Sequence, residues 1–342
     1  MARHADSLES LYVVVDLPVS GSDSYPSVVS SALVIELVGV GKTFDGGISA
    51  LQNVSLTVPT GSVCALLGHN GAGKTTMINI LSTLLRPTTG RAVVAGYDVV
   101  RQAAKVRSSI AMTGQLAALD WQLTGRENLV MFARLRGMSR KNAHLRAGVL
   151  IEQFDMTHAA DRLVTTYSGG MMRRIDIAAA LVVSPKVLFL DEPTTGLDPR
   201  SRRSVWDLVS ALKGHGVTVL LTTQYLEEAD VLSDSIVVLN EGRVVESGTA
   251  DDLKSRVGMS YCTVSPVNPD DLAKIVAVVA DLKDVQADYE ENTVSVLAPN
   301  GMATVTEVFR RVDQLGVELV DISLRRPSLD EVFLHLTGKV TA

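Results

Sequence analysis

The sequence predicts a two-domain α/β protein, with a main domain on a mostly parallel sheet and a smaller α+β domain after it. The chain has 342 residues, which is more than a domain with one hydrophobic core usually contains. Short apolar runs alternate with helical stretches through most of the chain, as in parallel α/β sheets. One apolar run, 62–67, leads through a glycine-rich loop into a helix. We expect the main domain at 33–258 and the second domain at 259–342.

Composition excludes several functional classes. The chain is 46% hydrophobic and 20% charged, which fits a globular protein and not a disordered one. Its net charge of −6 provides no basic field for nucleic acid. Cys64 and Cys262 lie far apart and outside any paired metal spacing, which favours a reducing cytosol. No apolar run reaches about 18 residues, and no export signal is visible. We therefore expect neither a spanning helix nor secretion.

The first half of the main domain changes from strands to helices. Residues 1–32 are serine-rich and predict a flexible extension. Helix 74–85 follows the glycine-rich loop. Thr124, with Glu127 three residues later, forms a capping-box pattern that opens an inserted helical subdomain at about 116–168. Strands are expected at 33–38, 50–58 and 62–67.

The second half of the main domain returns to alternating strands and helices. Asn240-Glu241-Gly242 predicts a hairpin, and helix 249–257 closes the domain. Strands are expected at 187–190, 217–222 and 236–239, separated by helices at 199–212 and 225–232.

The C-terminal domain shows the order β-α-β-β-α-β, which resembles a ferredoxin-like split βαβ unit. Ser328 and Glu331 form a second capping-box pattern and predict a final helix. The six elements are expected at 260–267, 269–282, 285–289, 294–297, 302–315 and 317–324.

A phosphate-binding loop follows the strand at 62–67. The run from Gly68 to Thr75 matches G-x-x-x-x-G-K-[ST] between a predicted strand and helix. Its glycines let successive N–H groups point at one phosphate chain. Lys74 supplies a charge at the β- and γ-phosphates, and Thr75 a hydroxyl ligand for Mg²⁺. The alternative is a glycine-rich turn before a surface helix. The expected nucleotide-binding residues are Gly68, His69, Asn70, Gly71, Ala72, Gly73, Lys74, Thr75 and Thr76.

Two carboxylates end the apolar strand at 187–190. A buried parallel strand delivers them to the carboxyl edge of the sheet, where α/β folds bind ligands. Asp191 is expected to hold Mg²⁺, and Glu192 to orient and deprotonate an attacking water as the general base. The alternative is a polar turn before Pro193. The phosphate-binding loop nearby favours the catalytic interpretation.

A second anion-binding element comes from Tyr167-Ser168-Gly169-Gly170-Met171. Ser168 is placed to cap a helix, and the two glycines allow an anion to approach the helix N-terminus. This run resembles the signature loop of ATP-binding cassette (ABC) ATPases. The resemblance implies that Ser168, Gly169 and Gly170 reach across a dimer to the γ-phosphate on the partner's loop. An ordinary capped helix is the alternative.

Further residues resemble family elements in the right order. Gln115 resembles the Q-loop glutamine, which implies contact with Mg²⁺ and with a membrane partner. Asp198 resembles the D-loop aspartate of the dimer interface, and Phe44 the aromatic that stacks on adenine. Gln224 stands where the family usually has a catalytic histidine. Glutamine can hydrogen-bond the γ-phosphate but cannot shuttle a proton. Met171 also replaces the usual glutamine of the signature.

The departures at Gln224 and Met171 are similar to the daunorubicin-resistance branch of drug exporters. Three further stretches share this similarity: Gly114-Gln115-Leu116-Ala117-Ala118, Leu123-Thr124-Gly125-Arg126-Glu127-Asn128-Leu129 and the tail Pro327-Ser328-Leu329-Asp330-Glu331-Val332-Phe333-Leu334. The resemblance implies a P-loop NTPase fold of the ABC type, binding ATP and Mg²⁺. It also implies a homodimer of ATPase subunits, peripheral on the cytoplasmic face of the membrane, with a separately encoded integral membrane permease. Two alternatives stay open. One is a cytosolic, non-transport cassette ATPase. The other is a nucleotide-gated regulator with little hydrolysis, suggested by Gln224.

Overall fold

A computed structural model describes residues 33–114, 117–256, 260–325, 329 and 332–333. The chain divides into two compact units, 1–247 and 248–342. The division precedes the expected boundary after residue 258, because helix α8 (Ala250–Arg256) groups with the second unit. The extension predicted at 1–32 lies outside the described residues. Among the described residues, no helix has both the length and the apolar character needed to cross a bilayer.

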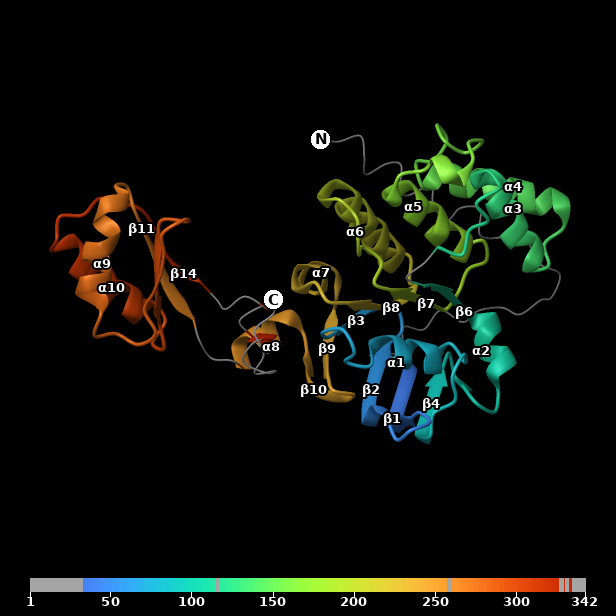
Figure 1. Cartoon of the computed structure of the whole chain (residues 1–342), viewed down its shortest axis with the longest axis horizontal. Helices are drawn as coiled ribbons and strands as arrows, with labels where there is room; N and C mark the ends of the chain where they lie inside the picture. Colours follow the sequence, from blue (N-terminus) through green and yellow to red (C-terminus); the bar gives the residue numbers. More distant parts are fainter. Residues whose placement is uncertain (1–32, 115–116, 257–259, 326–328, 330–331, 334–342) are drawn as a thin grey trace. The chain divides into compact units, whose positions relative to one another are not determined.

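A six-stranded sheet forms the centre of the first unit, in the order β10-β9-β3-β8-β7-β6 (Figure 1). The pairs β6–β7, β7–β8, β8–β3 and β3–β9 are parallel, as predicted. Every residue of β3, β7 and β8 is buried. Burial on both faces explains the continuous apolar runs Val63–Leu67 in β3 and 187–190 in β7. The strands are β3 (Val63–Leu67), β6 (Ile110–Thr113), β7 (Val187–Asp191), β8 (Thr218–Thr223), β9 (Ser235–Asn240) and β10 (Arg243–Gly248).

A second, antiparallel sheet has the order β2-β1-β4-β5. Strands β4 and β5, helix α2 and strand β6 are absent from the sequence prediction. In β4 only Ala92 and Val94 are buried, so this strand carries a weak apolar signal. The elements are β1 (Leu33–Thr43), β2 (Ser49–Pro59), β4 (Thr89–Val94), β5 (Tyr97–Asp98) and α2 (Ala103–Ser109).

The helices of the first unit surround the parallel sheet, and α3 and α4 form a group away from the antiparallel sheet (Figure 1). The capping box at Thr124 is confirmed: its Oγ1 accepts the Glu127 N–H at 3.2 Å, and Glu127 Oε2 accepts the Thr124 N–H at 2.8 Å. Helix α1 ends at Leu81, before the predicted end, and Thr83 adopts a φ of 70°. The helices are α1 (Lys74–Leu81), α3 (Gly125–Leu135), α4 (Arg140–Gln153), α5 (Gly169–Ala180), α6 (Pro199–Gly214) and α7 (Leu226–Leu232).

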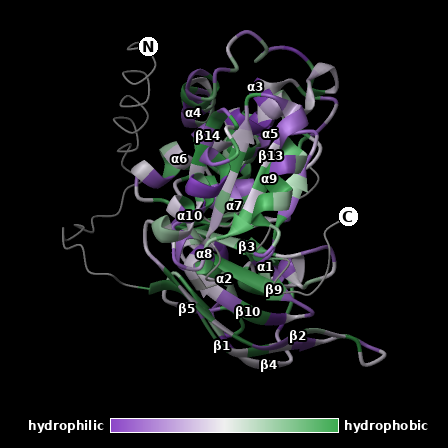
Figure 2. Cartoon of the chain, turned by 90° about the vertical axis from the view of Figure 1, so that its left-hand side faces the viewer, coloured by the Kyte–Doolittle hydropathy of each residue, from purple (hydrophilic) through white to green (hydrophobic). Residues whose placement is uncertain are grey.

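The main hydrophobic core joins the two sheets through helix α1. Met77, Ile78 and Ile80 of α1 are fully buried in one cluster with residues of β1, β2 and β3. Figure 2 shows β3 and β9 as hydrophobic strands at the centre of this unit. The loop between β3 and α1 is therefore anchored at both ends in the core, which gives it a rigid base.

The second unit contains a four-stranded antiparallel sheet in the order β12-β13-β11-β14. The predicted order β-α-β-β-α-β is observed, and residues of both α9 and α10 share a core with this sheet. Ser328 and Glu331, which predict a final helix, lie outside the described residues. The elements are β11 (Tyr261–Pro266), α9 (Leu272–Val279), β12 (Gln286–Asp288), β13 (Thr293–Leu297), α10 (Met302–Asp313) and β14 (Leu319–Arg325).

Candidate functional site

The glycine-rich loop occupies the turn from β3 to α1, as predicted. Gly71 and Gly73 have φ values of 84° and 106°, which favour glycine. A Cβ on Gly73 would lie 2.7 Å from the Ala50 carbonyl oxygen, and one on Gly68 would lie 2.5 Å from that of Leu239. Backbone from β2 and β9 therefore packs directly against the loop. Larger residues at Gly68 and Gly73 would displace the loop that presents its N–H groups.

The Lys74 side chain lies inside this loop. Its Nζ donates to the carbonyl oxygens of Gly68 at 2.6 Å and His69 at 3.2 Å. Nζ also lies 3.6 Å from Glu192 Oε1, and both side chains are at least nine-tenths buried. Burial lowers the pKa of Lys74, and the charges of Glu192 and Asp191 oppose this shift. A cation is thus held where the loop N–H groups would receive a phosphate chain.

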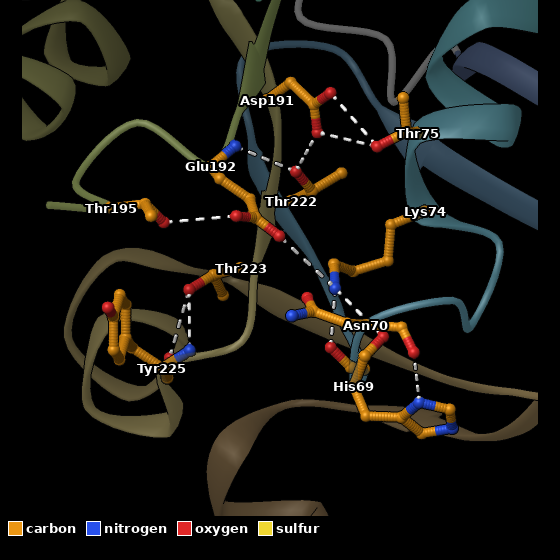
Figure 3. Close-up of polar contacts among 11 residues, drawn as sticks. His69, Asn70, Lys74, Thr75, Asp191, Glu192, Thr195, Thr222, Thr223 and Tyr225 are labelled. Atoms are coloured by element: carbon orange, nitrogen blue, oxygen red, sulfur yellow. Dashed lines mark hydrogen bonds and ion pairs between the residues drawn. The ribbon is translucent and has the colours of Figure 1, made fainter. Parts of the chain in front are cut away.

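Asp191 and Thr75 meet at the carboxyl end of β7 (Figure 3). Thr75 Oγ1 donates to the Asp191 carboxylate, 3.4 Å from Oδ1 and 3.2 Å from Oδ2. The Thr222 hydroxyl on β8 donates to Asp191 Oδ1 at 2.6 Å. Neighbouring parallel strands therefore fix the carboxylate beside the start of α1.

These oxygens fit a magnesium ion. Mg²⁺ prefers hard oxygen ligands and usually keeps several waters and substrate phosphates, so one hydroxyl and one carboxylate from the protein suffice. Thr75 Oγ1 and Asp191 provide that pair. In the described part of the chain, no three His, Cys, Asp or Glu side chains gather as a metal site. A dedicated all-protein metal cage is therefore not found there.

Glu192 directly follows β7 and adopts an unusual backbone conformation. Its φ is 47°, in the left-handed region, which costs a residue other than glycine about 1–3 kcal/mol. Its N–H donates to Thr222 Oγ1 at 2.9 Å, and its Oε2 accepts from the Thr195 hydroxyl at 3.2 Å. Oε1 faces Lys74 (Figure 3). The strained turn thus points the carboxylate at the phosphate-binding loop.

Ser168 and Asp198, which resemble the signature-loop serine and the D-loop aspartate, lie at the starts of two neighbouring helices. Ser168 caps α5, where its Oγ accepts the Met171 N–H at 3.3 Å. Asp198 caps α6 and accepts from the Ser201 hydroxyl at 2.6 Å. A Cβ on Gly170 would lie 2.4 Å from Ser201 Oγ. Both helix N-termini therefore pack together, and Ser168 and Gly169 are exposed at this surface.

Four further predicted site residues lie outside the groups described above. Phe44 lies in the turn between β1 and β2 and is 39% exposed, so it is not a core residue. His69 Nε2 lies 2.9 Å from Asn240 Oδ1, so its ring turns towards the end of β9. Gln224 is half-buried directly after β8. Gln115 lies outside the described residues.

A buried acid in helix α7, just after Gln224, is missing from the sequence prediction. Glu228 of α7 is fully buried, and its Oε1 accepts from Thr194 Oγ1 at 2.8 Å and Trp206 Nε1 at 3.1 Å. Burial raises its pKa, and hydrogen bonds from Thr223, Thr194 and Trp206 oppose this shift. Through Thr223, Trp206 and Thr194, Glu228 connects β8 with α6 and with the segment after Glu192. An acid among the apolar positions of α7 is the sequence signal for it.

We expect Glu228→Gln to make folding stability less dependent on pH. A carboxyl with a raised folded-state pKa loses stability as pH rises from its unfolded pKa through its folded pKa. The amide cannot ionise, yet its oxygen can still accept from Thr194 and Trp206. The variant should therefore match the parent near pH 4 and equal or exceed its melting temperature at pH 7. Thermal unfolding across this pH range is the measurement. The contrast is Glu228→Ala, which leaves the donors of Thr194 and Trp206 unpaired and should lower the free energy of unfolding by about 1–3 kcal/mol. If the glutamine variant matched the parent near pH 4 but melted below it at pH 7, the assignment would be contradicted.

An ion pair inside α5 also escaped the sequence prediction. Arg173 and Asp176 are 7% and 4% exposed, and Arg173 Nη1 lies 3.2 Å from Asp176 Oδ2. Burial lowers the pKa of Arg173 and raises that of Asp176, and the opposite charge of the partner opposes each shift. Burying two charges is costly unless further hydrogen bonds satisfy them. The pair therefore needs partners, and it finds them in the backbone around the site.

Both units of the chain are similar to known proteins. Residues 51–195 match the family model of the ABC transporter, and residues 248–337 match the C-terminal domain of DrrA1-3-like ATP-binding proteins. The doxorubicin resistance ATP-binding protein DrrA of Mycobacterium tuberculosis is 52% identical over 314 residues, covering 90% of this chain and 95% of that protein. The daunorubicin resistance ATP-binding protein DrrA2 of Streptomyces coeruleorubidus is 52% identical, with 85% and 91% covered.

Solved structures agree with the observed fold. The dimeric ATP-binding cassette MJ0796, in a post-hydrolysis state with ADP and Pi, is 28% identical. It superposes with a TM-score of 0.58 over 63% of this chain and 98% of that one. Together with the loop around Lys74 and the carboxylates at the end of β7, these likenesses establish that the chain belongs to the ATP-binding subunits of ABC transporters, in the branch of the daunorubicin and doxorubicin resistance proteins, and that it is an ATPase.

Proposed function

We propose that this chain powers the efflux of hydrophobic drugs, antibiotics or lipids through a separately encoded membrane permease, while lying on the cytoplasmic face of the membrane. One observation carries the proposal. Over nine-tenths of the chain, half of the residues are identical to those of a doxorubicin resistance ATP-binding protein. The second unit also matches the C-terminal domain of that group. The likeness thus includes the second unit, beyond the 63% of this chain that the cassette MJ0796 covers.

The site supports a mechanism based on positioning and charge neutralisation. The triphosphate of ATP lies along the N–H groups of 68–75, and Lys74 contacts its β- and γ-phosphates. Thr75 and Asp191 would hold Mg²⁺, which would supply positive charge to neutralise the phosphate oxygens. Glu192 orients the attacking water and accepts its proton. The buried contact between Lys74 Nζ and Glu192 Oε1, at 3.6 Å, supports the proposal that cation and base act at the same phosphate.

Two copies complete each other's sites in this mechanism. Ser168 and Gly169 are exposed at the N-terminus of α5, where the helix dipole attracts an anion. The γ-phosphate bound by one copy meets this N-terminus of the other copy, and Asp198 lies at the interface between them. Phe44, exposed after β1, stacks on the adenine. Gln115 senses both Mg²⁺ and the permease.

The rate of ATP hydrolysis distinguishes this transport function from the regulator with little hydrolysis that Gln224 suggests. Gln224 directly follows β8, at the carboxyl edge of the sheet where Asp191 ends the neighbouring strand β7 and Glu192 follows it. A glutamine donates a hydrogen bond to the γ-phosphate without carrying charge. Proton transfer therefore depends on Glu192 alone. Phosphate release well above the background of Glu192→Gln supports the transporter, whereas equal rates support the regulator.

Co-purification tests the proposed partner. The tagged full chain, extracted in mild detergent from cells that express it natively, is expected to retain an integral membrane protein. Cells with both subunits should accumulate less doxorubicin than cells in which the chain carries Lys74→Ala. Recovery of the chain with ribosomes or DNA, and without a membrane protein, would contradict the proposal and favour a cytosolic, non-transport cassette ATPase.

A further inference from the structure

We propose that Arg173, held by Asp176, is a positioning residue that fixes the catalytic turn at Glu192 to the signature helix α5. This inference rests on the proposed role of Glu192 as the general base. Its basis is the set of acceptors around one buried guanidinium, which come from three separate segments of the chain. They are the carbonyl oxygens of Pro193 at 2.9 Å, Gly114 at 2.8 Å and Asp191 at 3.3 Å, together with the Asp176 carboxylate at 3.2 Å.

The two carbonyl groups nearest the catalytic turn belong to the residues on either side of Glu192. Arg173 Nη2 donates to the Asp191 oxygen and Nε to the Pro193 oxygen. A planar guanidinium presents its donors in a fixed fork and can hold both carbonyls at once. A lysine ammonium is a single point and cannot reproduce this geometry. Arg173 therefore constrains the backbone before and after the proposed base.

The turn requires such a constraint, because Glu192 has a φ of 47°. A strained conformation persists when its surroundings over-determine it. Thr222 holds the Glu192 N–H from β8, and Arg173 holds the adjacent carbonyls from α5. Without Arg173 the turn can relax, and the carboxylate moves from its place 3.6 Å from the Lys74 ammonium. A misplacement of about 1 Å can reduce catalysis about 100-fold.

Asp176 orients the arginine and extends the connection. Its Oδ2 accepts from Arg173, and its Oδ1 accepts the Ala118 N–H at 3.1 Å. Arg173 also binds the Gly114 carbonyl, directly after β6. Helix α5, which starts at the proposed γ-phosphate contact of Ser168, is thus joined by side chains to the ends of β6 and β7. A displacement of α5 is transmitted to the backbone of the base.

The test replaces both charges at once, because removing one would leave the other buried and unpaired. Arg173→Met with Asp176→Leu keeps the volume and is compatible with folding. We expect kcat for ATP hydrolysis, measured on the full chain with its membrane subunit, to fall about 10- to 100-fold. KM for ATP should stay within about threefold, because neither side chain faces the phosphate-binding loop. A wild-type kcat in the folded double variant would overturn the inference.

Two further variants keep the test decisive. Arg174→Met, on the next residue of α5, removes a partly exposed arginine paired with Asp155, and we expect it to leave kcat unchanged. Arg173→Lys retains the charge and loses the fork. It should lower kcat at least about fivefold with an unchanged KM, and it decides the matter if the double variant does not fold. Wild-type turnover of Arg173→Lys would then overturn the inference. If Glu192→Gln itself retains turnover, the proposed base fails instead.

Discussion

Glu192→Gln is expected to lower steady-state ATP turnover by about 100-fold or more while ATP still binds. The amide has the shape of the carboxylate and can keep the hydrogen bond from Thr195, yet it cannot accept a proton from water. The phosphate-binding loop and Lys74 remain in place. Phosphate release and nucleotide affinity, measured on the same preparation, separate these two effects.

A matched control comes from helix α7. Glu227 is exposed, and Glu227→Gln makes the same chemical change outside the site. We expect this variant to hydrolyse ATP at the parental rate. Near-parental turnover in Glu192→Gln would show that another group takes the proton, and Gln224 cannot be that group.

Lys74→Ala is expected to weaken ATP binding about 10- to 150-fold. A hydrogen bond to a charged group contributes about 1.5–3 kcal/mol, and each 1.4 kcal/mol is about tenfold in affinity. Removal of the ammonium also leaves the Glu192 carboxylate without the cation that lies 3.6 Å from it, which adds repulsion towards the phosphates. Titration with a fluorescent ATP analogue measures the change directly.

The control for this change is Lys141→Ala, which removes an exposed lysine of α4 and should leave affinity unchanged. Both variants should remain folded, because Lys74 Nζ contacts loop carbonyls and Glu192, and the Glu192 carboxylate keeps its hydrogen bond from Thr195. Parental affinity in a folded Lys74→Ala protein would exclude the loop as the principal phosphate site.

Local sequence patterns predicted the elements that carry the chemistry. The glycine-rich loop lies between a fully buried strand and a helix, and Asp191 and Glu192 end another buried strand. Ser168 caps a helix as expected. These features depend on residues close together in the chain, such as a cap and its acceptor or a loop and the flanking strand. Periodicity and capping rules therefore suffice to find them.

Sequence alone determined the fold class, the ATP-binding loop and the pair of carboxylates, because each is encoded in a contiguous run. Tertiary structure decided how they act together. The contacts of Lys74 with Glu192, of the Arg173 guanidinium with its acceptors and of Glu228 with its donors connect separate segments of the chain. The first of these pairs is 118 residues apart. The left-handed turn at Glu192 is stable because β8 and α5 hold both of its sides. Which partners satisfy the buried polar groups depends on packing between elements and is not visible in any local pattern.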